Sequence, residues 1–150
     1  MANQATHDDA MLILRLFELR REEKMRKARD WFGREFFPQS IEDFKTVKDM
    51  QAQENEYYRM VISYWDMAAS FVVSGALNGP LFLQSGGEMI FVWAKIGDFV
   101  PHFREFTGNP EYLSNIENVI ASVPGAADRV AATKKFIAQM RESLANSAKG

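Results

Sequence analysis

The chain has 150 residues, 47% of them hydrophobic, and a formal net charge of −2 at pH 7. This length suits one domain with a sizeable core, and the near balance of 18 basic and 20 acidic residues argues against a nucleic-acid partner. The absence of cysteine excludes disulfides, thiolate metal ligands and cysteine nucleophiles.

The first predicted helix begins at Asp8 or Asp9 and runs to about Phe36, because apolar residues from Leu14 onward recur at helical spacing. The opening residues, MANQATHDDA, have neither the basic start nor the apolar core of a secretion signal. We therefore expect a cytoplasmic protein.

A short helix and a central helix are predicted next. The short helix spans 40–50, where Ser40 and Asp43 have the spacing of a capping box. The central helix spans 53–74 and is the least polar helix of the chain. Gly75 is placed to close it in the left-handed conformation.

Residues 67–87 carry no charge and have the length of a membrane span. Gly75, the Asn-Gly-Pro sequence at 78–80 and the Ser-Gly-Gly sequence at 85–87 interrupt this stretch. We therefore predict a buried hairpin with a short helical turn at 78–82, and no membrane anchor.

Three further helices complete the chain. A broad apolar face predicts one helix over 88–106 with a kink at Pro101. Asn109 has the place of an N-cap for a helix over 110–123, which begins with proline. The last helix is predicted over 126–145.

No segment alternates like a half-buried strand, and no internal repeat is visible. The predicted fold class is therefore all-α. We expect a single-domain helical bundle over residues 1–150, with roughly five long helices and two short ones. The ends, 1–8 and 146–150, are expected to be mobile tails.

Asp66 interrupts the mostly apolar sequence YYRMVISYWDMAAS of the central helix. On a helical wheel it falls in a narrow polar stripe made of Glu56, Arg59, Ser63, Asp66, Ser70 and Ser74. Arg59 and Asp66 are two turns apart, which is too far for them to pair. The stripe faces water, a cavity or another helix. In a cavity, Arg59 and Asp66 would bind a polar ligand or act in acid–base chemistry.

Other candidates for ligand binding lie on the predicted kinked helix. Lys95 and His102 are two turns apart and would hold a small anion between them, although Asp98 would repel that anion. Trp65 and Trp93 are candidates to line an apolar pocket, although aromatic residues at helical spacing more often belong to the core. With two histidines and no cysteine, we expect no metal site, and nothing indicates a cofactor.

The first helix has a second apolar side, formed by Leu12, Leu16 and Leu19, besides its main apolar face. One bundle does not easily bury both faces of a helix at its periphery. These three leucines are therefore candidate interface residues of a homodimer, unless the helix lies centrally within a larger bundle.

Three segments, LFELRREEKMRKARDWF, YWDMAAS and GEMIFVWAKI, resemble sequences of a family of small, soluble, all-helical bacterial proteins of uncharacterised function. The resemblance covers most of the chain. It implies an all-α fold and a bacterial cytosolic setting, and it assigns no activity and no site residue.

The sequence has no phosphate-binding loop, dinucleotide fingerprint, hydrolase nucleophile elbow or zinc-protease motif. The first hypothesis is accordingly a non-enzymatic protein that acts through self-association or other protein contacts, most simply as a homodimer. The alternative is a small-molecule-binding bundle whose aromatic pocket, lined by Trp65 and Trp93, lies beside the stripe of Arg59 and Asp66. A third hypothesis, an enzyme, requires Asp66 to converge with a cation in one cleft.

Overall fold

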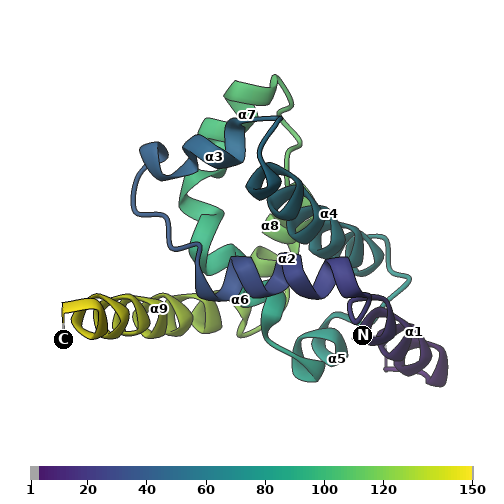
Figure 1. Cartoon of the computed structure of the whole chain (residues 1–150). Coiled ribbons are helices and arrows are strands. Elements are labelled where there is room, and N and C mark those ends of the chain that lie inside the picture. Colours follow the sequence, from purple (N-terminus) through teal and green to yellow (C-terminus); the bar gives the residue numbers. More distant parts are fainter. Residues whose placement is uncertain (1–3, 150) are drawn as a thin grey trace.

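The structure is a computed structural model that describes residues 4–149 (Figure 1). Its helices are α1 (His7–Leu19), α2 (Glu23–Arg34), α3 (Lys45–Lys48), α4 (Gln53–Val73), α5 (Gly79–Ser85), α6 (Glu88–Ile96), α7 (Val100–Thr107), α8 (Ser114–Ser122) and α9 (Ala126–Lys149). Two 3₁₀ turns, η1 (Ile41–Phe44) and η2 (Gly97–Phe99), precede α3 and α7. No strand is present among these residues, so the predicted all-α class is confirmed.

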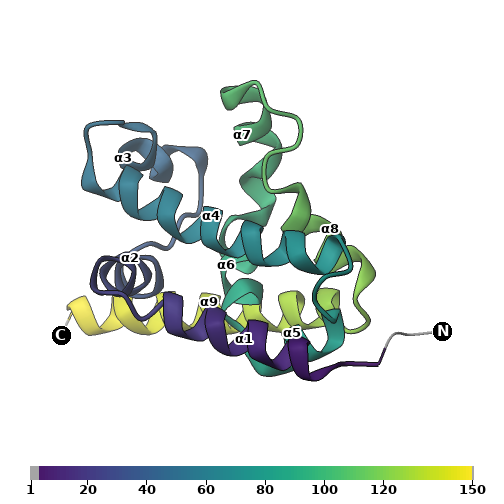
Figure 2. The ribbon, with the colours of Figure 1, turned by 90° about the vertical axis from the view of Figure 1, so that its right-hand side faces the viewer.

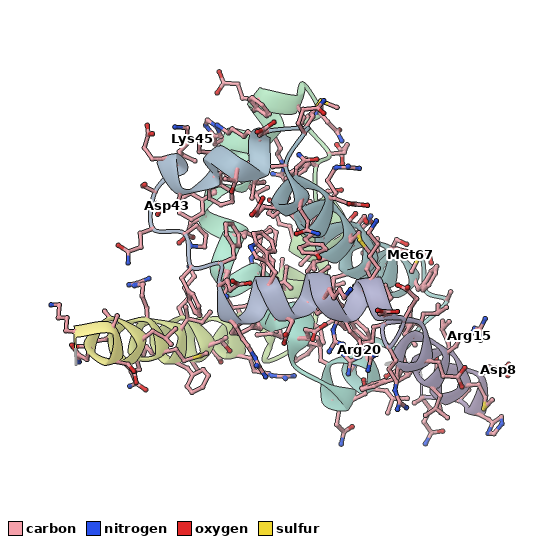
Figure 3. All side chains as sticks on the ribbon, in the orientation of Figure 1. Asp8, Arg15, Arg20, Asp43, Lys45 and Met67 are labelled. Atoms are coloured by element: carbon pink, nitrogen blue, oxygen red, sulfur yellow. The ribbon has the colours of Figure 1, made fainter. Side chains whose placement is uncertain are left out.

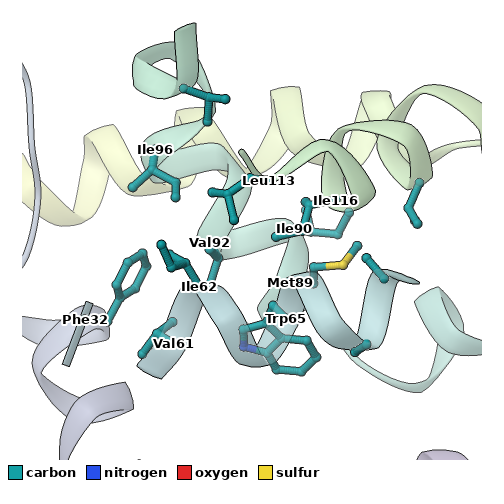
Figure 4. Packing of buried hydrophobic residues seen from close by; sticks show 14 of the residues in the cluster. Phe32, Val61, Ile62, Trp65, Met89, Ile90, Val92, Ile96, Leu113 and Ile116 are labelled. Atoms are coloured by element: carbon teal, nitrogen blue, oxygen red, sulfur yellow. The ribbon is translucent and has the colours of Figure 1, made fainter. Parts of the chain in front are cut away.

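The core lies around α4, which packs against α2, α3 and α8. Figure 4 shows the core cluster, which includes Val61 and Trp65 of α4, Ile90 of α6 and Ile116 of α8. All four are buried, and each large apolar side chain contributes about 1.5–3 kcal/mol when fully buried. α6 also packs against α9, which therefore joins the body through its first half.

The start of α1 differs from the prediction, because Thr6 is the N-cap and Asp9 lies inside the helix. Thr6 Oγ1 accepts a hydrogen bond from the Asp9 amide at 3.2 Å, and the Asp9 carboxylate accepts one from the Thr6 amide at 2.7 Å. The two residues thus form a capping box. Asp9 also accepts a hydrogen bond from the Asn78 amide at 2.9 Å, which ties α1 to the start of α5.

The single helix predicted over 8–36 is wrong, because the chain turns between α1 and α2. Glu22 caps α2: its carboxylate accepts hydrogen bonds from the amides of Lys24 and Met25. In Figure 2, α2 is seen end-on whereas α1 runs across the view. Leu14 therefore does not share the buried face of α2, and it is 56% exposed.

Other predicted turns and caps are confirmed. Asp43 accepts a hydrogen bond from the Ser40 amide at 3.1 Å in the predicted capping box. Gly75 has φ +86° directly after α4, in the left-handed region that glycine adopts without strain. The short helical turn predicted at 78–82 is α5, which runs on to Ser85, and Asn78 Oδ1 caps it by accepting a hydrogen bond from the Leu81 amide at 2.8 Å.

The predicted helix start at Asn109 is wrong. Residues 109–113 form turns, Leu113 has φ 52°, and α8 begins at Ser114. The Asn109 side chain accepts a hydrogen bond from the Glu111 amide, two residues on, as asparagine commonly does in turns. The helix predicted over 88–106 is interrupted at η2, which ends two residues before the predicted kink at Pro101, and Pro101 lies in the first turn of α7.

The ends of the chain continue helices. His7 and Asp8 belong to α1 and residues 146–149 to α9, whereas residues 1–3 and 150, which the predicted tails include, lie outside the described residues. The mobility of these ends stays a prediction. Among residues 4–149, no helix is both long enough and apolar enough to cross a membrane.

Candidate functional site

Asp66 lies against the N-terminus of α8. Its Oδ1 accepts a hydrogen bond from the Ile116 amide at 3.1 Å, and its Oδ2 accepts one from Asn115 Nδ2 at 3.0 Å. The first amides of a helix have no partner within the helix, and the N-cap residue of α8, Leu113, supplies no side-chain acceptor. Asp66 thus caps α8 from α4, and at this position the polar stripe faces another helix.

The remainder of the stripe is more open. Arg59 is exposed and donates from Nε to Asn55 Oδ1 at 2.9 Å, four residues before it on α4. Arg59 and Asp66 both line an open groove of about 520 Å³ between α4 and the turns before α8. The groove brings these two candidates to one surface without bringing them into contact.

Replacing Asp66 with alanine should lower the free energy of unfolding by about 1–2 kcal/mol, because α8 loses its cap and the favourable charge at its N-terminus. Ser63→Ala is the matched control, since the Ser63 hydroxyl donates only to carbonyls of its own helix. Urea denaturation of both variants measures the difference. Equal losses in the two would contradict the capping role of Asp66.

Trp65 lies on a different side of α4 from Asp66 and donates from Nε1 to Glu88 Oε2 at 3.0 Å. Glu88 also accepts from Nε and Nη2 of Arg29 at 2.8–3.0 Å, and Arg20 Nη1 lies 3.7 Å from it, where α1 meets α2 (Figure 3). The hydrogen bonds with Glu88 raise the pKa of Arg29, whereas burial lowers the pKa of Arg20. Glu88 therefore joins α1, α2, α4 and α6 through one carboxylate.

A cavity next to Trp65 has a volume of about 20 Å³, which is room for about one water molecule. It lies between α1, α4, α5 and α6, and neither Trp93 nor Asp66 lines it. Trp93 packs over Gly97, where an added Cβ would lie 2.8 Å from Trp93 Cε2. This cavity therefore does not include Trp93 or the polar stripe of Arg59 and Asp66, which the predicted aromatic pocket requires.

Lys95 is buried at the C-terminus of α2. It is 5% exposed, and Nζ donates to the carbonyls of Phe32 and Phe36, the latter at 2.6 Å. The ring of Phe37 lies 3.8 Å from Nζ, a favourable distance for an ammonium ion. Among the described residues no carboxylate pairs with Lys95, and burial lowers its pKa to about 7.

His102 lies apart from Lys95. Its Nε2 is 2.7 Å from Lys48 Nζ, a contact that joins α7 to α3, and its ring stacks on Phe106. Lys95 and His102 therefore contact different helices and do not share an anion site. His102 and Asp66 likewise have separate partners.

The cleft outside Lys95 has a volume of about 280 Å³ and lies between α9, α6 and the segment after α2. Three cations line it, namely Lys95, Lys134 and Arg141, with Asp98 as the carboxylate. Asp98 pairs with Lys134 at 3.0 Å. Arg141 is half-buried and has no hydrogen bond or ion pair within the described part of the chain, so this cleft has excess positive charge.

The three candidate interface leucines are placed differently from one another. Leu16 is a core residue at 4% exposure and Leu12 is half-buried against the core, so neither is available to a second chain. Leu19 is 44% exposed. The break after α1 is the reason, because it lets the side with Leu12 and Leu16 face the body.

Two features escaped the sequence analysis. Glu88 has no partner within its own helix, so only the tertiary structure reveals its contacts with Arg20, Arg29 and Trp65. The apolar side of α9, where Phe136 and Leu144 are exposed, did leave a signal, because Phe136, Met140 and Leu144 repeat every four residues.

Residues 5–123 match the family described as "Domain of unknown function (DUF4760)", and the chain belongs to this family. The match includes α1 to α8 and ends before α9. No curated protein and no solved structure matches the chain.

Proposed function

We propose that this member of the family acts through self-association, and that two copies pair through α9. The pairing surface, which we call the α9 strip, consists of Phe136, Met140 and Leu144. The observation that carries the proposal is that Phe136 and Leu144 on the apolar face of α9 are exposed, with Met140 half-buried between them.

The exposure of the α9 strip supports this proposal. Phe136 is 56% exposed and Leu144 is 50% exposed, although Ile137, on the same side of the helix as Leu144, is buried. After Ile137 no described residue of α9 is buried, and the helix extends away from the body in Figure 1. The part of α9 after Ile137 is about 18 Å long at 1.5 Å per residue.

The spacing of the α9 strip favours a second copy as its partner. Phe136 and Leu144 lie four residues before and after Met140. In an antiparallel pair centred on Met140, Phe136 of each copy meets Leu144 of the other, which is the reciprocal contact of a twofold interface. The strip covers an arc of about 80°, and the charged residues of this part of α9 lie outside it.

The exposed apolar residues of α1 are a weaker surface. Met11 and Leu14 are 51% and 56% exposed. The ion pair between Arg15 and Glu18 separates them from Leu19, and both of its side chains are about two-thirds exposed. Burying α1 against a second copy would remove these charges from water. The desolvation free energy of the two charges exceeds the favourable energy of their ion pair.

Met140→Glu should shift the protein to monomer, because it places a carboxylate at the centre of the α9 strip. Gln139→Glu adds the same charge one residue away and outside the strip, so it should leave association almost unchanged. Because the overlap is short, we expect a weak dimer that buries less than the about 800 Å² per partner of a standard interface. Sedimentation velocity over a concentration series measures the dissociation constant.

The proposal fails if the wild-type protein stays monomeric up to about 1 mM, or if the two variants associate equally well. Circular dichroism of both variants checks that α9 keeps its helix. Gln139 is exposed, Met140 is half-buried, and no described residue of α9 after Ile137 is buried, so the two substitutions should change the melting temperature of the body only slightly.

A further inference from the structure

We propose that the cleft outside Lys95 binds a small organic acid. The carboxylate of this ligand pairs with Arg141, and its apolar body lies between Phe37, Phe99 and Ile137. This site is independent of the proposed self-association, because Arg141 and Ile137 border the cleft whereas the centre of the α9 strip, Met140, does not.

The charges of the cleft select an anion. Lys95, Lys134 and Arg141 face one carboxylate, that of Asp98, which Lys134 already pairs with through both oxygens at 3.0 and 3.1 Å. Lys95 donates to the backbone carbonyls of Phe32 and Phe36, so it offers no free donor to a ligand, and Arg141 supplies the unpaired positive charge. A cationic ligand would be repelled.

Arg141 selects the kind of anion. A guanidinium binds a carboxylate through two parallel hydrogen bonds, and this guanidinium has no other partner among residues 4–149. It is half-buried, so a pair formed here is screened less than one on the open surface. One free guanidinium matches one carboxylate.

The walls of the cleft select the rest of the ligand. Phe37 and Phe99 are half-buried aromatic residues, Ile137 is 6% exposed, and Ala94 and Ala138 complete the apolar lining. The volume of about 280 Å³ is just below the range of about 300–1,000 Å³ for pockets that bind drug-sized molecules. The ligand is therefore a small acid with a short aliphatic or aromatic body.

Three probes separate the contribution of the carboxylate from that of the apolar body. Octanoate has both the carboxylate and the apolar body, 1-octanol has only the body, and acetate has little more than the carboxylate. In isothermal titration calorimetry with the full chain, octanoate should bind with a Kd of about 1 mM or tighter, as expected for a ligand of this size. The other two probes should bind at least about tenfold more weakly.

Arg141→Gln should weaken octanoate binding about tenfold or more, whereas Lys135→Gln should not change it. Both changes remove one positive charge from α9, and Lys135 does not line the cleft. Amide chemical shifts should move with octanoate at Phe37, Gln39 and residues 94–99. Met140→Glu should still bind octanoate, so this site and the self-association are tested separately.

Three results would overturn the proposal: no saturable octanoate binding, equal binding of octanoate and 1-octanol, or the same loss in the Arg141 and Lys135 variants. The last result would show that octanoate responds to the general charge of α9 and not to this cleft.

Discussion

Replacing Glu88 with alanine should lower the free energy of unfolding by about 3 kcal/mol, the largest loss expected for a single charged residue of this protein. The change removes the acceptor of the buried Trp65 N–H, and an unpartnered buried donor costs about 1–3 kcal/mol. It also leaves Arg20 and Arg29, each no more than 25% exposed, next to each other without a counter-charge. Urea denaturation monitored by Trp fluorescence measures the loss.

Two variants separate the contributions. Glu88→Gln keeps the shape and one acceptor for Trp65 but removes the charge. Its free energy of unfolding should therefore lie between those of the wild type and of Glu88→Ala. Glu117→Ala breaks a comparable ion pair, that between Glu117 and Arg104. The Glu117 side chain is 49% exposed. We expect this pair to contribute less than about 1 kcal/mol. A loss in Glu117→Ala as large as in Glu88→Ala would contradict the role given to Glu88.

The sequence predicted the helices best where the signal was local. The capping box of Ser40 and Asp43, the left-handed Gly75 and the short helix near residues 78–82 depend on neighbours within four residues, and all three are confirmed. The break between α1 and α2 was missed, because the segment RREEK has good helix formers throughout. Glu22 is an unusual N-cap residue, so its capping of α2 had no recognisable pattern.

Sites that depend on contacts between distant helices were predicted less well. The wheel correctly placed Asp66 in a polar stripe, but the partner of Asp66 is the N-terminus of α8, about 50 residues away. No residue in the first turn of α8 indicates from the sequence that a side chain of another helix caps α8. Lys95 was chosen for its charge, whereas its environment is set by the carbonyls at the end of α2, which no sequence pattern indicates.

Lys95 should make the protein more stable as the pH rises from 7 to about 10. Burial lowers its pKa in the folded protein to about 7, from an ordinary value of 10.5. Between these values the unfolded chain carries a proton on Lys95 and the folded protein does not, so raising the pH favours folding. The slope is at most about 1.4 kcal/mol per pH unit. Over the whole interval from pH 7 to pH 10 we expect a gain of about 3–4 kcal/mol.

The tyrosines limit this window from above. Burial raises the pKa of Tyr64 and of Tyr112 to about 12, and that of Tyr58 well above 10. Above pH 10 the unfolded chain loses these phenolic protons first, so stability should fall again. The free energy of unfolding should therefore have a maximum near pH 10.

Urea denaturation from pH 7 to pH 11 tests both limbs of this profile. Lys95→Met should abolish the rise below pH 10 and keep the fall above it, because methionine fills a similar volume without a titrating amine. It should also be less stable than wild type at pH 10, since the Phe32 and Phe36 carbonyls lose their donor. Lys135→Met, at an exposed lysine of α9, should keep the whole profile. A rise of the same size in Lys95→Met would show that another group causes it.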